Sequence, residues 1–145
     1  MLTKESLALL VGALTLAACG TAVFAPSSTG SSASARVSGT VAYQERLALR
    51  PGVVIKVQLA NVSRTDAPAI VIGEQIIKTD GNQMPFRFEI PFDPAAIKPQ
   101  NTYAVSARME DANGRLRFIT DQHYAVITRG APTHVDLVLR QVSAP

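Results

Sequence analysis

The sequence predicts an all-β domain, a β-sandwich of about seven or eight short antiparallel strands. Apolar and polar residues alternate with period two through most of residues 36–142. Turn-forming residues interrupt this alternation at short intervals, and only one short segment favours a helix. Since each strand has one apolar face, two layers of strands must cover each other to bury those faces.

The strands are defined by where the alternation starts and stops. In the first strand, Val37, Val41 and Tyr43 lie on one face, and Ser38 and Thr40 lie on the other. The later strands repeat this pattern with different apolar residues. In order, the predicted strands cover residues 37–43, 53–60, 69–77, 86–90, 103–109, 116–120, 124–128 and 135–139.

The connections carry residues that favour turns. The strongest signal is in 111–114, because its Asn-Gly pair adopts positive φ at little cost. Asp93 and Pro94 suit the cap and the first position of a single helical turn, which Pro99 ends. Gly73 interrupts the third strand and predicts a β-bulge. The remaining turns are predicted at 51–52, 66–68, 80–82 and 130–132.

Residues 1–18 predict a bacterial signal peptide. Lys4 provides a positive start, and 12 of these 18 residues are apolar. The uncharged stretch 6–18 is shorter than a membrane span of about 20 residues, and it suits the apolar core of a signal peptide. The mature protein is therefore expected to lack this segment.

The signal peptide ends in a lipobox, the order Leu-small-small-Cys, formed by Leu16, Ala17, Ala18 and Cys19. The small residues fit the signal-peptidase cleft, and the Cys19 thiol is alkylated by diacylglycerol. Cleavage and N-acylation, for example by palmitate, then give the two or more chains that stable anchoring needs. The alternative is a signal peptide cut elsewhere, with Cys19 a buried thiol. Gly20, where an Asp would favour the inner membrane, indicates the outer membrane.

The rest of the chain divides by composition. Residues 19–35 comprise the lipidated cysteine and an uncharged tether rich in Ser, Gly and Ala, which cannot bury enough surface to fold. Residues 36–142 form the β domain, and 143–145 form a short tail. A single cysteine excludes an intramolecular disulfide and a Cys-rich zinc site. The net charge of +3 comes from dispersed basic residues, so no nucleic-acid-binding patch is predicted.

Two pairs of residues are the candidates for a catalytic or metal site. Asp121 and His123 lie two residues apart, as do His134 and Asp136, and this spacing puts each pair on one strand face. If the four side chains converged, they would form a metal site or two acid–base pairs. The simpler interpretation is solvated polar residues on strand faces. The sequence has no nucleophile elbow, P-loop or dinucleotide fingerprint. We predict a non-enzymatic protein whose only prosthetic group is the lipid.

Two regions are candidates for partner binding. Arg64 and Asp66 lie in a polar connection, which indicates either a recognition loop or a turn in which Asp66 accepts local N–H groups. Phe86 and Phe92 lie in a strand flanked by prolines. Alternating Phe is typical of core packing, and the prolines indicate an edge strand. An edge or groove beside it would accept a partner's strand or helix.

Several motifs resemble those of the YbaY-like lipoprotein family, which is grouped with the YscW-type secretion pilotins. They are GTVAY (39–43), VSRTDAP (62–68), PFRFEIPFDP (85–94), YAVSAR (103–108), GRL (114–116) and TRG (128–130). The resemblance implies a transthyretin-like β-sandwich on a lipid anchor, without catalytic residues. In the pilotin branch, such lipoproteins help secretin subunits reach the outer membrane and assemble there.

The combined prediction is an interaction or assembly module, anchored in the outer membrane and facing the periplasm. Its expected partner is an outer-membrane protein such as a secretin. The alternative is a ligand-binding sandwich that holds a glycan, a peptide or a small apolar molecule. A deep pocket lined by Tyr43, Tyr103 or Tyr124 would favour that alternative.

Overall fold

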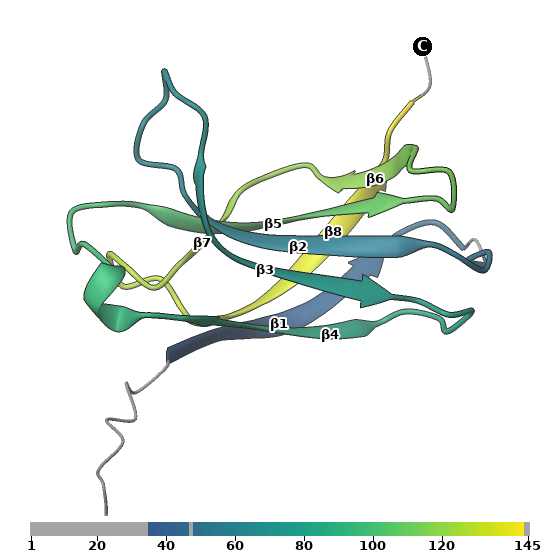
Figure 1. Ribbon diagram of the computed structural model, residues 1–145, viewed down its shortest axis with the longest axis horizontal. Coiled ribbons are helices and arrows are strands. Elements are labelled where there is room, and N and C mark those ends of the chain that lie inside the picture. Colours follow the sequence, from purple (N-terminus) through teal and green to yellow (C-terminus); the bar gives the residue numbers. More distant parts are fainter. Residues whose placement is uncertain (1–34, 47, 144–145) are drawn as a thin grey trace, which may run out of the picture. The chain divides into compact units, whose positions relative to one another are not determined.

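The computed structural model describes residues 35–46 and 48–143 (Figure 1). The chain divides into one unit of residues 1–30 and a second of residues 31–145, and only the second contains described residues. The predicted signal peptide, Cys19 and the tether up to residue 34 lie outside them. No helix within the described ranges is long and apolar enough to cross a membrane.

The described residues form eight strands and one short 3₁₀ turn, at the positions that the sequence predicts. Asp93 caps the turn, and its side chain accepts the N–H of Ala95. The strands are β1 (Ala35–Tyr43), β2 (Val54–Asn61), β3 (Ile70–Lys78), β4 (Phe86–Phe92), β5 (Tyr103–Glu110), β6 (Leu116–Thr120), β7 (Tyr124–Val126) and β8 (His134–Gln141), and the 3₁₀ turn is η1 (Pro94–Ala96).

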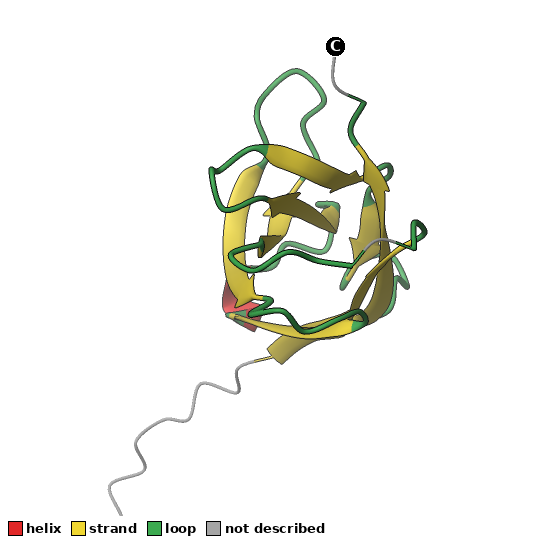
Figure 2. Cartoon of the chain, turned by 90° about the vertical axis from the view of Figure 1, so that its right-hand side faces the viewer, coloured by secondary structure: helices red, strands yellow, loops and turns green. Residues whose placement is uncertain are grey.

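The strands join in one continuous sheet, in the order β3-β2-β5-β6-β8-β1-β4, and β7 pairs with the start of β5. The predicted all-β class is confirmed. The two layers that cover each other are the halves of this single sheet, which curls into a nearly closed barrel until its end strands β3 and β4 lie side by side (Figure 2). Strand twist and local bulges produce such curvature. One register shift lies beside Gly73, where a bulge is predicted.

One pair departs from the predicted antiparallel arrangement. Strands β1 and β8 run parallel, with Ser38 opposite His134, whereas the other pairs are antiparallel. A tight hairpin forces an antiparallel neighbour, but strands that are far apart in the sequence can meet in either direction. Alternation alone therefore could not predict the direction of this pair.

The inner faces of the sheet pack into one core. Most of its residues are the apolar members of the period-two pattern, so the predicted inner faces are confirmed. The buried members of this cluster are Val37, Val41, Val53, Ile55, Val57, Leu59, Phe86, Phe88, Ile90, Phe92, Tyr103, Val105, Ala107, Met109, Phe118, Val126, Leu137 and Leu139.

The gap between β3 and β4, which we call the seam, is shaped by Gly73 and Gln75. A Cβ atom on Gly73 would lie 2.5 Å from Cγ2 of Ile90, so glycine permits the close approach of the two strands. The Gln75 Oε1 atom accepts the backbone N–H of Glu89 at 2.6 Å. Pro91, which has no N–H, lies two residues further along β4. The predicted edge strand is confirmed, and β3 covers its edge.

Candidate functional site

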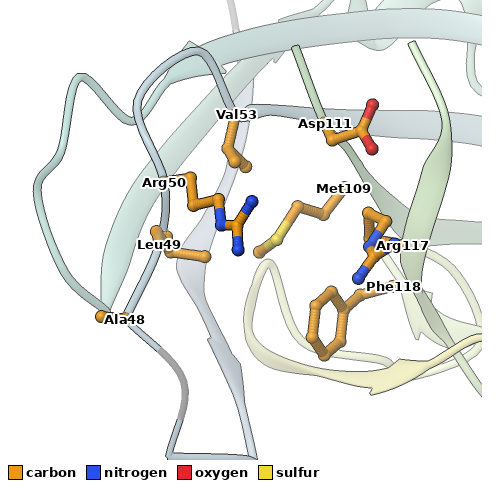
Figure 3. A pocket seen from close by; sticks show the side chains of 8 residues that line it. All are labelled: Ala48, Leu49, Arg50, Val53, Met109, Asp111, Arg117 and Phe118. Atoms are coloured by element: carbon orange, nitrogen blue, oxygen red, sulfur yellow. The ribbon is translucent and has the colours of Figure 1, made fainter. Parts of the chain in front are cut away.

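A hollow of about 300 Å³ opens at the end of the domain that lies away from Ala35 (Figure 3). We call it the distal pocket. Strands β1 and β5 both end here, because the pairings run them in the same direction through the sheet. The residues that line the distal pocket are Ala48, Leu49, Arg50, Val53, Met109, Asp111, Arg117 and Phe118.

The floor of the distal pocket is the apolar end of the core. Met109 and Phe118 are partners in the register of β5 and β6, and Val53 directly precedes β2. All three are buried. The ring of Tyr43 supports the ring of Phe118, with the centroids 5.4 Å apart. Leu49, in the β1–β2 connection, covers one side. An apolar group that enters the hollow would therefore meet only apolar side chains below it.

Two arginines lie at the rim. Arg50 belongs to the β1–β2 connection, and Arg117 is an extra residue where the register of β5 and β6 shifts after Met109. Figure 3 shows the Arg50 guanidinium and the Met109 thioether pointing into the hollow from different walls. Within the described part of the chain, neither guanidinium has a hydrogen-bond or ion-pair partner. Both positive charges are therefore open to a bound group.

The one carboxylate that lines the distal pocket is engaged by its own turn. The Oδ1 atom of Asp111 accepts the N–H of Asn113 at 2.9 Å and the N–H of Arg115 at 3.0 Å. These bonds hold the predicted Asn-Gly hairpin, in which Gly114 has a φ of 77°. The distal pocket therefore combines an apolar floor with guanidinium groups at its rim.

A second hollow, of about 670 Å³, is a shallow depression over β1 and β4. Its lining is mostly polar. Ser38 Oγ and His134 Nδ1 lie 3.2 Å apart, and His134 Nε2 lies 3.8 Å from Asp136 Oδ1. The Thr40 hydroxyl donates to the same carboxylate at 2.7 Å. The side chains of His134 and Asp136 are 65% and 70% exposed, so solvent screens both. A catalytic triad instead relies on a buried carboxylate that fixes its histidine.

The predicted quartet of Asp121, His123, His134 and Asp136 does not converge. Asp121 pairs with Arg140 at 2.6 Å, on the side of β8 that faces β6. Among the described residues, no group of three or more His, Cys, Asp or Glu side chains could hold a metal ion. His134 and Asp136 are exposed polar side chains on one face of β8, as the simpler interpretation expects. Asp121 and His123 lie in the β6–β7 connection, so the expectation that they share a strand face is wrong.

Arg64 and Asp66 lie in the exposed β2–β3 connection, 62–69, which projects from the domain (Figure 1). Their side chains are 4.0 Å apart, 72% and 83% exposed, and screened by water. The base of the loop is fixed by other residues. Asn61 Oδ1 accepts the N–H of Ser63, and the Ser63 hydroxyl accepts the N–H of Thr102. The loop thus presents both charged side chains to solvent.

Phe86 and Phe92 lie at the two ends of β4, and each is 9% exposed. Both belong to the buried core, as the packing interpretation of the alternating phenylalanines expects. A partner that contacts this strand would meet the outward side chains of Arg87 and Glu89 first.

The three tyrosines are structural in the described domain. The Tyr103 hydroxyl accepts the N–H of Lys98 at 3.0 Å, and the Tyr124 hydroxyl accepts the N–H of Val138 at 3.1 Å. Tyr43 packs against Phe118. None of the three lines either hollow described above. The pocket that would favour the ligand-binding alternative on these residues is therefore not observed.

Sequence reasoning missed the distal pocket. From the sequence, Arg117 is expected to be an ordinary outward-facing residue of its strand. The register shift that moves it to the rim does not change the alternation of apolar and polar residues. Leu49 and Arg50 lie in a connection without periodicity. A large apolar residue such as Leu49, placed between arginines in a connection, is the signal that this segment covers the core.

Comparisons with known proteins agree on one group. A family model described as "Type III secretion system lipoprotein chaperone (YscW)" matches residues 32–139. The uncharacterized lipoprotein YbaY of Escherichia coli (strain K12) is 40% identical over 103 residues, which are 71% of this chain and 53% of that protein. The chain thus spans about half the length of that relative.

A solved structure shows the same similarity in three dimensions. It is the structure of an alternative pilotin from the type II secretion system of Vibrio cholerae, with 46% sequence identity and a TM-score of 0.72. The match covers 76% of this chain and 98% of the pilotin chain. The region that matches therefore corresponds to nearly the whole of that pilotin structure.

Proposed function

Because the chain belongs to the YscW family of type III secretion system lipoprotein chaperones, we propose that it is a non-enzymatic assembly module, anchored by lipid in the outer membrane. Its proposed role is to bind a secretin on the periplasmic side and to assist its assembly. The observation that carries this proposal is the 46% identity to the Vibrio cholerae pilotin over 98% of that chain.

The proposed anchor is Cys19, with diacylglycerol on its thiol and an acyl chain on its amino group. Leu16, Ala17 and Ala18 would be read by the signal peptidase, and Gly20 supports transfer to the outer membrane. Each buried methylene contributes about 0.8 kcal/mol, so two or more chains make the attachment stable. A flexible coil of the 15 residues 20–34, between Cys19 and β1, would span roughly 19–23 Å.

The partner is proposed to meet the domain on surfaces away from this attachment. The chain enters β1 at Ala35, and the distal pocket lies at the opposite end of that strand. The pocket therefore faces away from the point of attachment. Arg64 and Asp66 are proposed as additional, exposed contacts, and Phe86 and Phe92 as core residues that support the β4 side.

Affinity capture tests the proposal. The full-length lipoprotein, tagged at its C-terminus, is captured from detergent-solubilised envelopes of cells that express a secretin. We expect the secretin to be recovered as the main outer-membrane protein. A capture that recovers no secretin and no other outer-membrane protein would contradict the proposal. A tagged lipoprotein of unrelated fold serves as the control for co-solubilised membrane proteins.

A further inference from the structure

We propose that the distal pocket binds an apolar side chain of the partner protein that is flanked by carboxylates. The recognised segment is thus acidic and amphipathic. This inference rests on the proposed function, and it adds the chemistry of the segment and the place where it binds.

The size and lining of the distal pocket define the apolar part. Its volume of about 300 Å³ lies at the lower end of the range for small-molecule sites, about 300–1,000 Å³. It therefore suits one or two side chains better than a long acyl chain. The floor of Val53, Met109 and Phe118 offers only apolar contacts, and the flexible thioether of Met109 adapts to the shape of an inserted group. Buried anchors of this kind dominate the energy of protein interfaces.

The rim defines the charged part. The guanidinium groups of Arg50 and Arg117 have no partner within the described residues, so neither charge must be released from an existing ion pair. Planar guanidinium groups bind carboxylates through two parallel hydrogen bonds. Asp111, the carboxylate at the rim, already accepts two backbone N–H groups. A carboxylate next to the inserted apolar side chain would pair with these guanidinium groups. A cationic side chain at the same place would be repelled by them.

The two connections that contribute residues to the distal pocket also carry an excess of positive charge. Residues 44–46, 48–53 and 111–117, the described parts of these connections, contain Arg46, Arg50, Arg115 and Arg117 against Glu45 and Asp111, a net charge of +2. All four arginines are exposed. Complementary charge raises the rate of association and excludes partners of the wrong sign.

Peptide selection on the full-length lipoprotein in phospholipid nanodiscs tests the inference. A displayed library of random dodecapeptides is selected for binding. We expect the enriched peptides to share a large apolar residue next to Asp or Glu, and their synthetic Asp/Glu→Asn/Gln versions to bind about tenfold or more weakly. Enriched peptides that are neutral or basic, or a library that yields no enrichment, would overturn the inference.

Variants locate the binding site. The double variant Arg50→Glu/Arg117→Glu should weaken binding of the enriched peptides by about tenfold or more, and Arg50→Gln/Arg117→Gln should weaken it less. The matched control is Arg108→Glu/Arg129→Glu, since these exposed arginines lie outside the distal pocket. Thermal melts determine whether each variant is folded. If the Glu variant is unfolded, the Gln variant still tests the inference. Equal binding by the pocket and control variants would overturn the inference.

Two further outcomes separate this inference from the proposed function. If the Arg50→Gln/Arg117→Gln lipoprotein still captures a secretin in undiminished amount, the pocket assignment is wrong and the proposed function stands. Decanoate, a single-chain anion, is the probe for a lipid site. Saturable binding of decanoate that the pocket variants abolish, without any peptide enrichment, would show an amphiphile site and overturn the peptide assignment.

Discussion

Gln75 holds the two end strands of the sheet together. It lies opposite the buried Val57 in the register of β2 and β3, so its side chain starts from the inner face. From there its amide oxygen accepts the N–H of Glu89, an edge donor of β4. In the sequence, this polar residue only interrupts the apolar face of its strand. Its purpose could not be predicted, because its partner becomes a neighbour only when the sheet curls.

Replacing Gln75 by Leu should lower the free energy of unfolding by about 0.5–1.5 kcal/mol, because the hydrogen bond that joins β3 to β4 across the seam is lost. Urea denaturation of the full-length protein measures this change. Gln58→Leu is the matched control. Gln58 donates to Glu74 on the outer face of β2 and β3, where water can replace the bond, so a change within about 0.5 kcal/mol is expected. Equal losses in the two variants would contradict the role assigned to Gln75.

The β5–β6 hairpin is the element that connects local sequence to the candidate site. Its Asn-Gly turn was predictable because positive φ at Gly114 follows from backbone sterics. The register shift after Met109 was not predictable, since one extra residue in a strand leaves the alternation on either side intact. That shift places Arg117 at the rim of the distal pocket. The turn could therefore be predicted from the sequence, whereas the distal pocket beside it could not.

Asp111→Ala should destabilise this hairpin, lowering the free energy of unfolding by about 1–2 kcal/mol, because two backbone N–H groups lose their acceptor. Asp111→Asn retains an oxygen at the same position and should stay within about 0.5 kcal/mol of the natural protein. Thermal or urea denaturation distinguishes the two variants. If both variants lose the same stability, the charge of Asp111 matters more than its hydrogen bonds, contrary to this account.

At the scale of the whole domain, period-two alternation predicted which residues face the core but not which strands become neighbours. The pairing of β1 with β8 joins the two ends of the described domain, and nothing local specifies it. The contact of β3 with β4 closes the curl in the same non-local way. Inner faces follow from the energy of apolar burial. Strand order and direction follow from the topology of the whole chain.

Membrane attachment of the whole molecule is predicted to depend on one thiol. Cys19→Ser should leave the protein soluble or unprocessed, because neither acyl group can be added, and membrane fractionation with a mobility assay of the processed form measures this. Gly20→Asp keeps the thiol and should move the processed lipoprotein toward the inner membrane. A Cys19→Ser protein that is processed and remains in the membrane fraction would contradict the anchor.

In the proposed function, the domain is anchored by lipid and brings a secretin to the outer membrane. The most direct measurement is the distribution of the assembled secretin between membranes separated on a density gradient, in cells with and without the lipoprotein. We expect secretin multimers to leave the outer-membrane fraction when the lipoprotein is absent. They should return with the natural protein and not with the Cys19→Ser variant. A secretin that assembles in the outer membrane to the same extent in all three cases would contradict the claim.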